Sequence, residues 1–179
     1  MSACSEHKWK TRSNFEWCNN PFDNHCLTCV RPLAEFDSIV WSPETIKGIV
    51  ALEGVQRRFT KKLPGLYRYY YQARLRRLHL PSLELRRLYA DVVWCYKILF
   101  GIVDVQSDKF FEFNMRPSRW HQYKLYKDRS VSRVRAAFFI SERVVKVWNS
   151  LPDSVDFSTR SKFRRSVMRV DLSKFLRCF

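Results

Sequence analysis

The chain has 179 residues, of which 46% are hydrophobic and 16% aromatic, enough apolar side chains for one globular core. This content, with only four glycines and seven prolines, excludes a low-complexity or disordered chain. Its 33 Lys and Arg residues against 17 Asp and Glu leave a formal net charge of +16, which indicates a polyanionic partner, most simply a nucleic acid.

Targeting signals are not evident in the sequence. The first ten residues are polar, no apolar signal segment follows them, and no run reaches the roughly 18 apolar residues of a membrane span. We therefore expect an intracellular protein, cytoplasmic or nuclear, with no membrane partner and with its six cysteines reduced.

Residues 1–38 show no sustained helical period, and we expect them to form an irregular leader. Two pairs within it, Cys4 with His7 and Cys26 with Cys29, have the two-residue gap that lets both side chains bind one Zn²⁺ ion. Cys18 and His25 are further candidates, so the sequence does not define a single set of four ligands. A zinc site and free thiols in an irregular leader both remain open, and zinc is the only cofactor we consider.

From Trp41 onward the spacing of apolar residues predicts an all-α domain, residues 39–179, with about five helices in an irregular arrangement. The first helix is expected over residues 43–62, with Ser42 as N-cap and Pro43 in the first turn, and Pro64-Gly65 ends it. Its predicted inward stripe consists of Ile46, Ile49, Val50, Leu52, Val55 and Phe59.

Two more helices follow this one. Residues 70–78 are expected to turn apolar side chains inward and arginines, among them Arg74, outward. After Pro81, with Ser82 as N-cap, residues 83–102 are apolar around most of the circumference, so this helix should be central.

The last third of the chain is predicted to contain two further helices, over residues 131–148 and 159–175. Between the central helix and these two helices, residues 108–113 are expected to form a short helical turn, whose Phe110, Phe111 and Phe113 fold back on the core. Residues 123–126 suit a short extended segment and a loop equally. The expected inward positions are Val134, Phe138, Ile140, Val144, Val147, Trp148, Phe163, Val167, Val170 and Phe175.

Catalytic motifs are not recognisable, and we expect neither an enzyme activity nor a small-molecule substrate. Tyr89-Ala90-Asp91-Val92 is close to a polymerase metal-binding signature, but its last residue cannot bind Mg²⁺ and it lies in a long helical run. His121 has no acidic or nucleophilic residue at close spacing. We interpret the tetrapeptide as part of a core helix and assign no catalytic role to His121.

A dense basic segment extends from Gln56 to Leu88, where the only acidic residue is Glu84. Interleaved aromatic residues would let bases stack beside phosphate contacts, as in single-strand binding, although a solvated helix face is the alternative. A second basic stretch, residues 160–169, is weaker. The candidate nucleic-acid-binding residues are Arg57, Arg58, Lys61, Lys62, Arg68, Arg74, Arg76, Arg77, Arg86 and Arg87.

Motifs in a fixed order carry a resemblance to a known family. They are Leu52-Glu53-Gly54-Val55-Gln56-Arg57-Arg58-Phe59 through Leu66, Leu80-Pro81-Ser82-Leu83-Glu84-Leu85 within residues 74–88, Tyr96-Lys97-Ile98-Leu99, Val147-Trp148-Asn149-Ser150-Leu151-Pro152 within residues 143–152, and Ser161-Lys162-Phe163-Arg164. Over roughly residues 40–176 the chain resembles the region that follows the polymerase core in jockey-like non-LTR retrotransposon reverse transcriptases.

This resemblance implies a helical, thumb-proximal region of a reverse transcriptase polyprotein that helps to hold template RNA or an RNA/DNA primer–template duplex. None of the matched positions is a catalytic residue in that family, whose palm and endonuclease would lie upstream. Two alternatives stay open. The chain is a structural remnant that only packs against a polymerase domain, or it is a small zinc-dependent nucleic-acid-binding protein that acts through residues 4–29.

Overall fold

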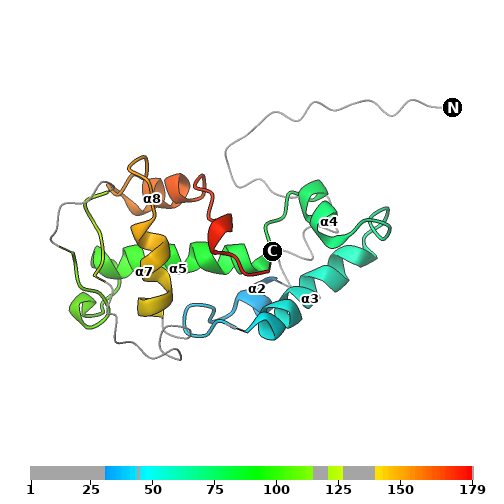
Figure 1. Cartoon of the computed structure of the whole chain (residues 1–179), viewed down its shortest axis with the longest axis horizontal. Helices are drawn as coiled ribbons and strands as arrows, with labels where there is room; N and C mark the ends of the chain where they lie inside the picture. The colour runs from blue at the N-terminus through cyan, green and yellow to red at the C-terminus, as the bar shows by residue number, and fades with distance from the viewer. Residues whose placement is uncertain (1–30, 44, 115–120, 127–139, 179) are drawn as a thin grey trace.

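The computed structural model describes residues 31–178 except 44, 115–120 and 127–139. Within these ranges the fold has six α-helices, two 3₁₀ segments and no β-strand, which confirms the predicted all-α class (Figure 1). The elements are α2 (Arg31–Glu35), α3 (Ile46–Lys62), α4 (Tyr71–Arg77), α5 (Leu83–Leu99), η2 (Ser107–Lys109), α7 (Ile140–Asn149), α8 (Arg160–Val167) and η3 (Ser173–Phe175). None of the described helices is both long and apolar enough to cross a membrane.

Helix α5 is central, as its apolar circumference predicts, and it contacts α2, α3, α7 and α8. In Figure 1, α3 and α4 lie together at one end of the molecule, whereas α7 and α8 lie along the other part of α5. Ser82 caps α5 as expected, since its Oγ accepts a hydrogen bond from the Leu85 amide. The helix ends three residues before the predicted Ile102, ahead of Gly101, whose φ of 63° is left-handed.

The main apolar core lies between α5, α7 and α8 and is rich in aromatic rings. Phe163 and Trp148, both 0% exposed, pack against each other with ring centroids 5.6 Å apart, and Phe163 stacks on Tyr96 at 4.3 Å. The predicted inward positions Val144, Val147 and Val167 are also buried. The end of the molecule that holds α3 and α4 has a much smaller apolar cluster, formed by Tyr71, Leu75 and Leu80.

Helix α3 differs from its prediction in both its start and its buried face. Its N-cap is Thr45, whose hydroxyl accepts from the Gly48 amide at 3.2 Å, so the prediction of Ser42 is wrong. The buried residues are Ile49, Glu53, Gln56 and Thr60, whereas Ile46, Val50 and Val55 of the predicted stripe are exposed. The polar face is buried because its side chains find hydrogen-bond partners on α4 and α5, described below.

Three other expectations need correction. Residues 31–35, expected to be irregular, form α2, and the predicted last helix stops at Val167, although residues 173–175 form η3. Of the three phenylalanines expected to fold back on the core, Phe111 is buried, whereas Phe110 and Phe113 are each 42% exposed. Leu125 makes an isolated antiparallel bridge with Phe113 and is 1% exposed. The expected helix residues 131–139, with Val134 and Phe138, lie outside the described residues.

Candidate nucleic-acid interface

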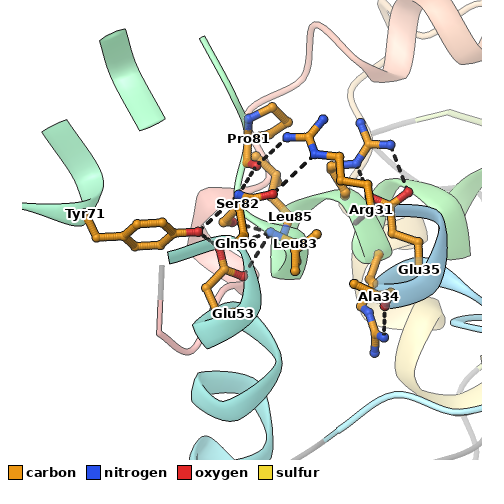
Figure 2. Close-up of polar contacts among 12 residues, drawn as sticks. Arg31, Ala34, Glu35, Glu53, Gln56, Tyr71, Pro81, Ser82, Leu83 and Leu85 are labelled. Atoms are coloured by element: carbon orange, nitrogen blue, oxygen red, sulfur yellow. Dashed lines mark hydrogen bonds and ion pairs between the residues drawn. The ribbon is translucent and has the colours of Figure 1, made fainter. Parts of the chain in front are cut away.

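A buried polar network joins α3 to α4 and to the first turn of α5 (Figure 2). The Glu53 carboxylate, 1% exposed, accepts hydrogen bonds from the Leu83 amide at 3.0 and 3.2 Å and from the Tyr71 hydroxyl. Burial raises the pKa of Glu53, and burial, reinforced by Glu53, raises the pKa of Tyr71 well above its usual range. The carboxylate therefore satisfies a buried amide at the positive end of α5 and fixes the start of α4.

Gln56 extends the network from the next turn of α3 (Figure 2). Its Nε2 donates to the Tyr71 hydroxyl at 3.0 Å and to the Pro81 carbonyl at 3.2 Å, and its Oε1 accepts from the Nε of Arg31 at 3.2 Å. Gln56 is 0% exposed and so is entirely dependent on these protein partners. Hydrogen bonds thus join α2, α3, α4 and the Pro81 turn at the end of the molecule where the apolar cluster of Tyr71, Leu75 and Leu80 is small.

Arg74 is one of the arginines predicted to point outward, but it is only 4% exposed. Its guanidinium donates to the Tyr69 carbonyl at 3.0 Å and to the Arg57 carbonyl at 3.2 Å. The outward prediction is therefore wrong, because one carbonyl of α3 and one of the connecting loop accept hydrogen bonds that hold this guanidinium inside. Arg74 anchors the connecting loop and does not lie on the surface that a phosphate would reach.

Arg86 and Arg87 are likewise directed to α2. Arg86 forms a bidentate ion pair with Glu35, and Arg87, 4% exposed, donates to the Ala34 carbonyl at 2.6 Å. The Arg87 guanidinium also lies 4.6 Å from the ring centroid of Trp41, and burial lowers its pKa. These arginines hold α2 on α5 and are not placed for nucleic-acid contact. These contacts were not predicted, because residues 31–38 were expected to be irregular and residues 31–35 instead form α2.

Six of the ten predicted cations are exposed around the C-terminal part of α3, the connecting loop and α4, and Arg57 beside them is half-buried. We call the six the α3–α4 basic surface. No acidic residue occurs between Glu53, which is buried, and Glu84, so the sequence supplies no carboxylate within this surface. Its members are Arg58, Lys61, Lys62, Arg68, Arg76 and Arg77.

Aromatic rings lie among these cations. Tyr67 and Tyr70 are 57% and 66% exposed, whereas Tyr69 is half-buried and Tyr71 is buried. The Arg68 guanidinium lies 5.3 Å from the Tyr67 ring centroid and that of Arg77 lies 3.8 Å from the Tyr69 ring centroid. This arrangement brings positive charges and exposed rings together, the combination used to bind single-stranded nucleic acids.

Asp91 of the Tyr89–Val92 tetrapeptide and His121, the other two positions considered for chemistry, are both buried. Asp91 lies within α5 and accepts two hydrogen bonds from Arg143, both at 2.7 Å, so the Tyr89–Val92 tetrapeptide is part of a core helix as predicted. His121 is buried in an aromatic cluster, with Nε2 2.9 Å from the Trp148 carbonyl, and burial lowers its pKa. Asp91 thus pairs with the Arg143 guanidinium, and His121 pairs with a backbone carbonyl inside the core.

The predicted metal ligands Cys4, His7, Cys26 and Cys29 all lie outside the described residues. Within the described ranges no group of three or more His, Cys, Asp or Glu side chains is arranged to hold a metal ion. Scans against protein-family models, curated proteins and solved structures found no match to the chain.

Proposed function

We propose that this protein is a non-catalytic nucleic-acid-binding module of the type that follows the polymerase core in non-LTR retrotransposon reverse transcriptases. Its role would be to hold template RNA or the primer–template, with the chemistry carried out by a polymerase domain. The sequence motifs support the family, and the α3–α4 basic surface supports the binding activity.

The observation that carries the proposal is the concentration of exposed cations on one pair of helices. Two cationic helices held side by side repel each other, and a polyanion relieves this repulsion while releasing its own counterions. The buried network of Glu53 and Gln56 holds α3 and α4 together, so the cations are already positioned before a ligand arrives.

The test is a binding titration of the full chain with a labelled RNA at two or more salt concentrations. The affinity should fall steeply with salt, because each neutralised phosphate releases a counterion. The variant R58Q/K61Q/K62Q/R76Q should bind RNA of any sequence more weakly, with a slope of log K against log salt lower by about 3, since four phosphate contacts are removed.

A matched variant, K47Q/K109Q/K146Q/K174Q, removes the same charge from exposed lysines outside the α3–α4 basic surface. It should retain a slope close to that of the wild-type protein. Equal losses in the two variants would show that net charge alone attracts the RNA, and an affinity independent of salt in the wild-type protein would overturn the proposal.

A second function, packing against a polymerase domain, is favoured by apolar side chains exposed around α2. Leu33, Phe36 and Val40 are 80%, 71% and 71% exposed, and Ile46 at the start of α3 is 63% exposed. Large apolar side chains exposed this closely in sequence are typical of a surface that another protein covers. In this case L33S/F36S/V40S should improve the solubility of the isolated chain, whereas adding RNA should not.

A further inference from the structure

The loop between α3 and α4 has a defined conformation that presents two tyrosine rings to solvent. Its backbone makes two successive turns, with the Leu66 amide donating to the Leu63 carbonyl and the Tyr69 amide to the Leu66 carbonyl, both at 3.1 Å. Gly65, at φ 76°, supplies the left-handed residue of the first turn. The loop is therefore a hydrogen-bonded connection.

The loop is also anchored from inside the protein. At its end the Tyr69 carbonyl accepts from Arg74, and the next residue but one, Tyr71, donates to Glu53 and accepts from Gln56. Both Arg57 and Arg74 place their guanidinium groups near the Tyr71 ring, at 5.1 and 5.6 Å from its centroid. Tyr71 and Arg74 thus fix the backbone on which Tyr67 and Tyr70 are carried.

Tyr70 is positioned differently from its buried neighbour. It is the N-cap residue of α4 but makes no capping hydrogen bond with its side chain, and the residue is 66% exposed. The N-cap position usually holds Ser, Thr, Asp or Asn, so the local helix gains nothing from a tyrosine here. An exposed ring on an anchored backbone loses little conformational freedom when a flat partner stacks on it.

We propose that the ligand of the α3–α4 basic surface is single-stranded nucleic acid, whose bases stack on Tyr67 and Tyr70 while its phosphates contact the surrounding cations. This inference rests on the proposed function and narrows it to unpaired strands. A tyrosine ring on a loop can stack only on a base whose face is free, and in a duplex those faces are covered by neighbouring base pairs except at the ends. Every base has a face that can stack on a ring, so this contact accepts any base and requires no particular sugar.

The first experiment compares single-stranded and duplex oligonucleotides of one length by fluorescence anisotropy, as RNA and as DNA. The single strand should bind more tightly than the duplex in both chemistries. The variant Y70A should lose affinity for the single strand by about 5-fold or more while keeping the wild-type salt slope, because stacking releases no counterion. Y70F should bind like the wild type, whereas Y70L should resemble Y70A.

Tyr126 provides the matched control, since it is 54% exposed and belongs to a segment at the other end of the molecule (Figure 1). Y126A should leave the affinity unchanged. If the duplex binds as tightly as the single strand, or if Y70A and Y126A behave alike, the stacking inference is wrong while the proposed function stands. If neither strand form binds in a salt-dependent way, the proposed function itself is wrong.

A second experiment uses the wild-type chain and so does not depend on how variants fold. A single strand containing 5-iodouridine crosslinks on irradiation to aromatic side chains stacked on the base. After digestion with trypsin the crosslinks should appear in the peptides of residues 63–68 and 69–74, which contain Tyr67 and Tyr70. Crosslinks found only in other peptides would overturn the assignment.

Discussion

The buried Glu53 carboxylate allows a stability prediction whose size follows from its hydrogen bonds. Glu53→Ala removes the acceptor of the Leu83 amide and of the Tyr71 hydroxyl in a part of the protein that water does not reach. Each buried donor left without an acceptor costs about 1–3 kcal/mol. The raised pKa of Glu53 indicates that burial destabilises its ionised carboxylate in the wild type. The alanine variant does not bear this desolvation cost, which partly offsets its loss of hydrogen bonds. We expect a net loss of about 2–4 kcal/mol, a large part of the roughly 5–15 kcal/mol typical of a domain.

The assay is urea unfolding of the full chain followed by helical circular dichroism. Glu53→Gln keeps one acceptor oxygen and should lose less than Glu53→Ala. The stability difference between the wild type and Glu53→Gln should also become smaller as pH rises above 4.5, the ordinary pKa of this carboxyl group. Burial raises the pKa of Glu53 in the folded protein, so the wild type loses stability when Glu53 ionises, whereas the glutamine variant does not. Glu112→Ala, at an exposed carboxylate, should change stability by less than about 0.5 kcal/mol. A loss for Glu53→Ala no larger than that of the control would refute the view that this network holds α3 to α5.

Three further predictions concern the larger core. Phe163→Ala should lower the free energy of unfolding by about 3–5 kcal/mol in the same assay, because it leaves a cavity among stacked rings. Asp91→Asn should cost about 3–5 kcal/mol, since the Arg143 guanidinium, at 13% side-chain exposure, loses its ionic partner. His121 should make unfolding pH-dependent: its lowered pKa means that stability is full above the ordinary value of 6.5 and falls as pH decreases below it, measured by urea titrations at several pH values.

Matched variants separate these effects from general damage. Met168→Ala, on the exposed side just after α8, should be nearly neutral, and a loss equal to that of Phe163→Ala would contradict the cavity argument. A double-mutant cycle of Asp91→Asn with Arg143→Met should show coupling of at least about 1 kcal/mol; additive losses would mean that the pair does not interact. His121→Gln should remove the decline in stability at acidic pH, whereas His79→Asn, at an exposed position with φ 51°, should not.

The sequence predicted the helical class, the central helix and most helix ends, because these depend on local signals. Ser82 and the preceding Pro81 define the start of α5, and Pro64-Gly65 ends α3 after Lys62. The apolar periods of α7 and α8 identify Trp148 and Phe163 as core residues. Each of these features follows from the preferences of a few neighbouring residues.

The candidate interface was only partly predictable. The dense cations and tyrosines between Gln56 and Leu88 were visible in the sequence, and six of the ten cations are exposed around α3 and α4. The sequence did not show that Arg74 and Arg87 are buried, since a charged side chain favours solvent unless carbonyls distant in sequence accept its hydrogen bonds. Those carbonyls become neighbours only when α4 has packed on α3 and α2 has packed on α5.

The same reasoning explains the face of α3. Periodicity favours an apolar stripe through Ile46 and Val50, but the folded chain buries Glu53 and Gln56. Their partners are a hydroxyl of α4, an amide of α5 and the carbonyl of the Pro81 turn between these helices. Local pattern therefore determined which segments are helices. Long-range hydrogen bonding, which no local pattern encodes, decided which face of α3 is buried and which arginines remain on the surface.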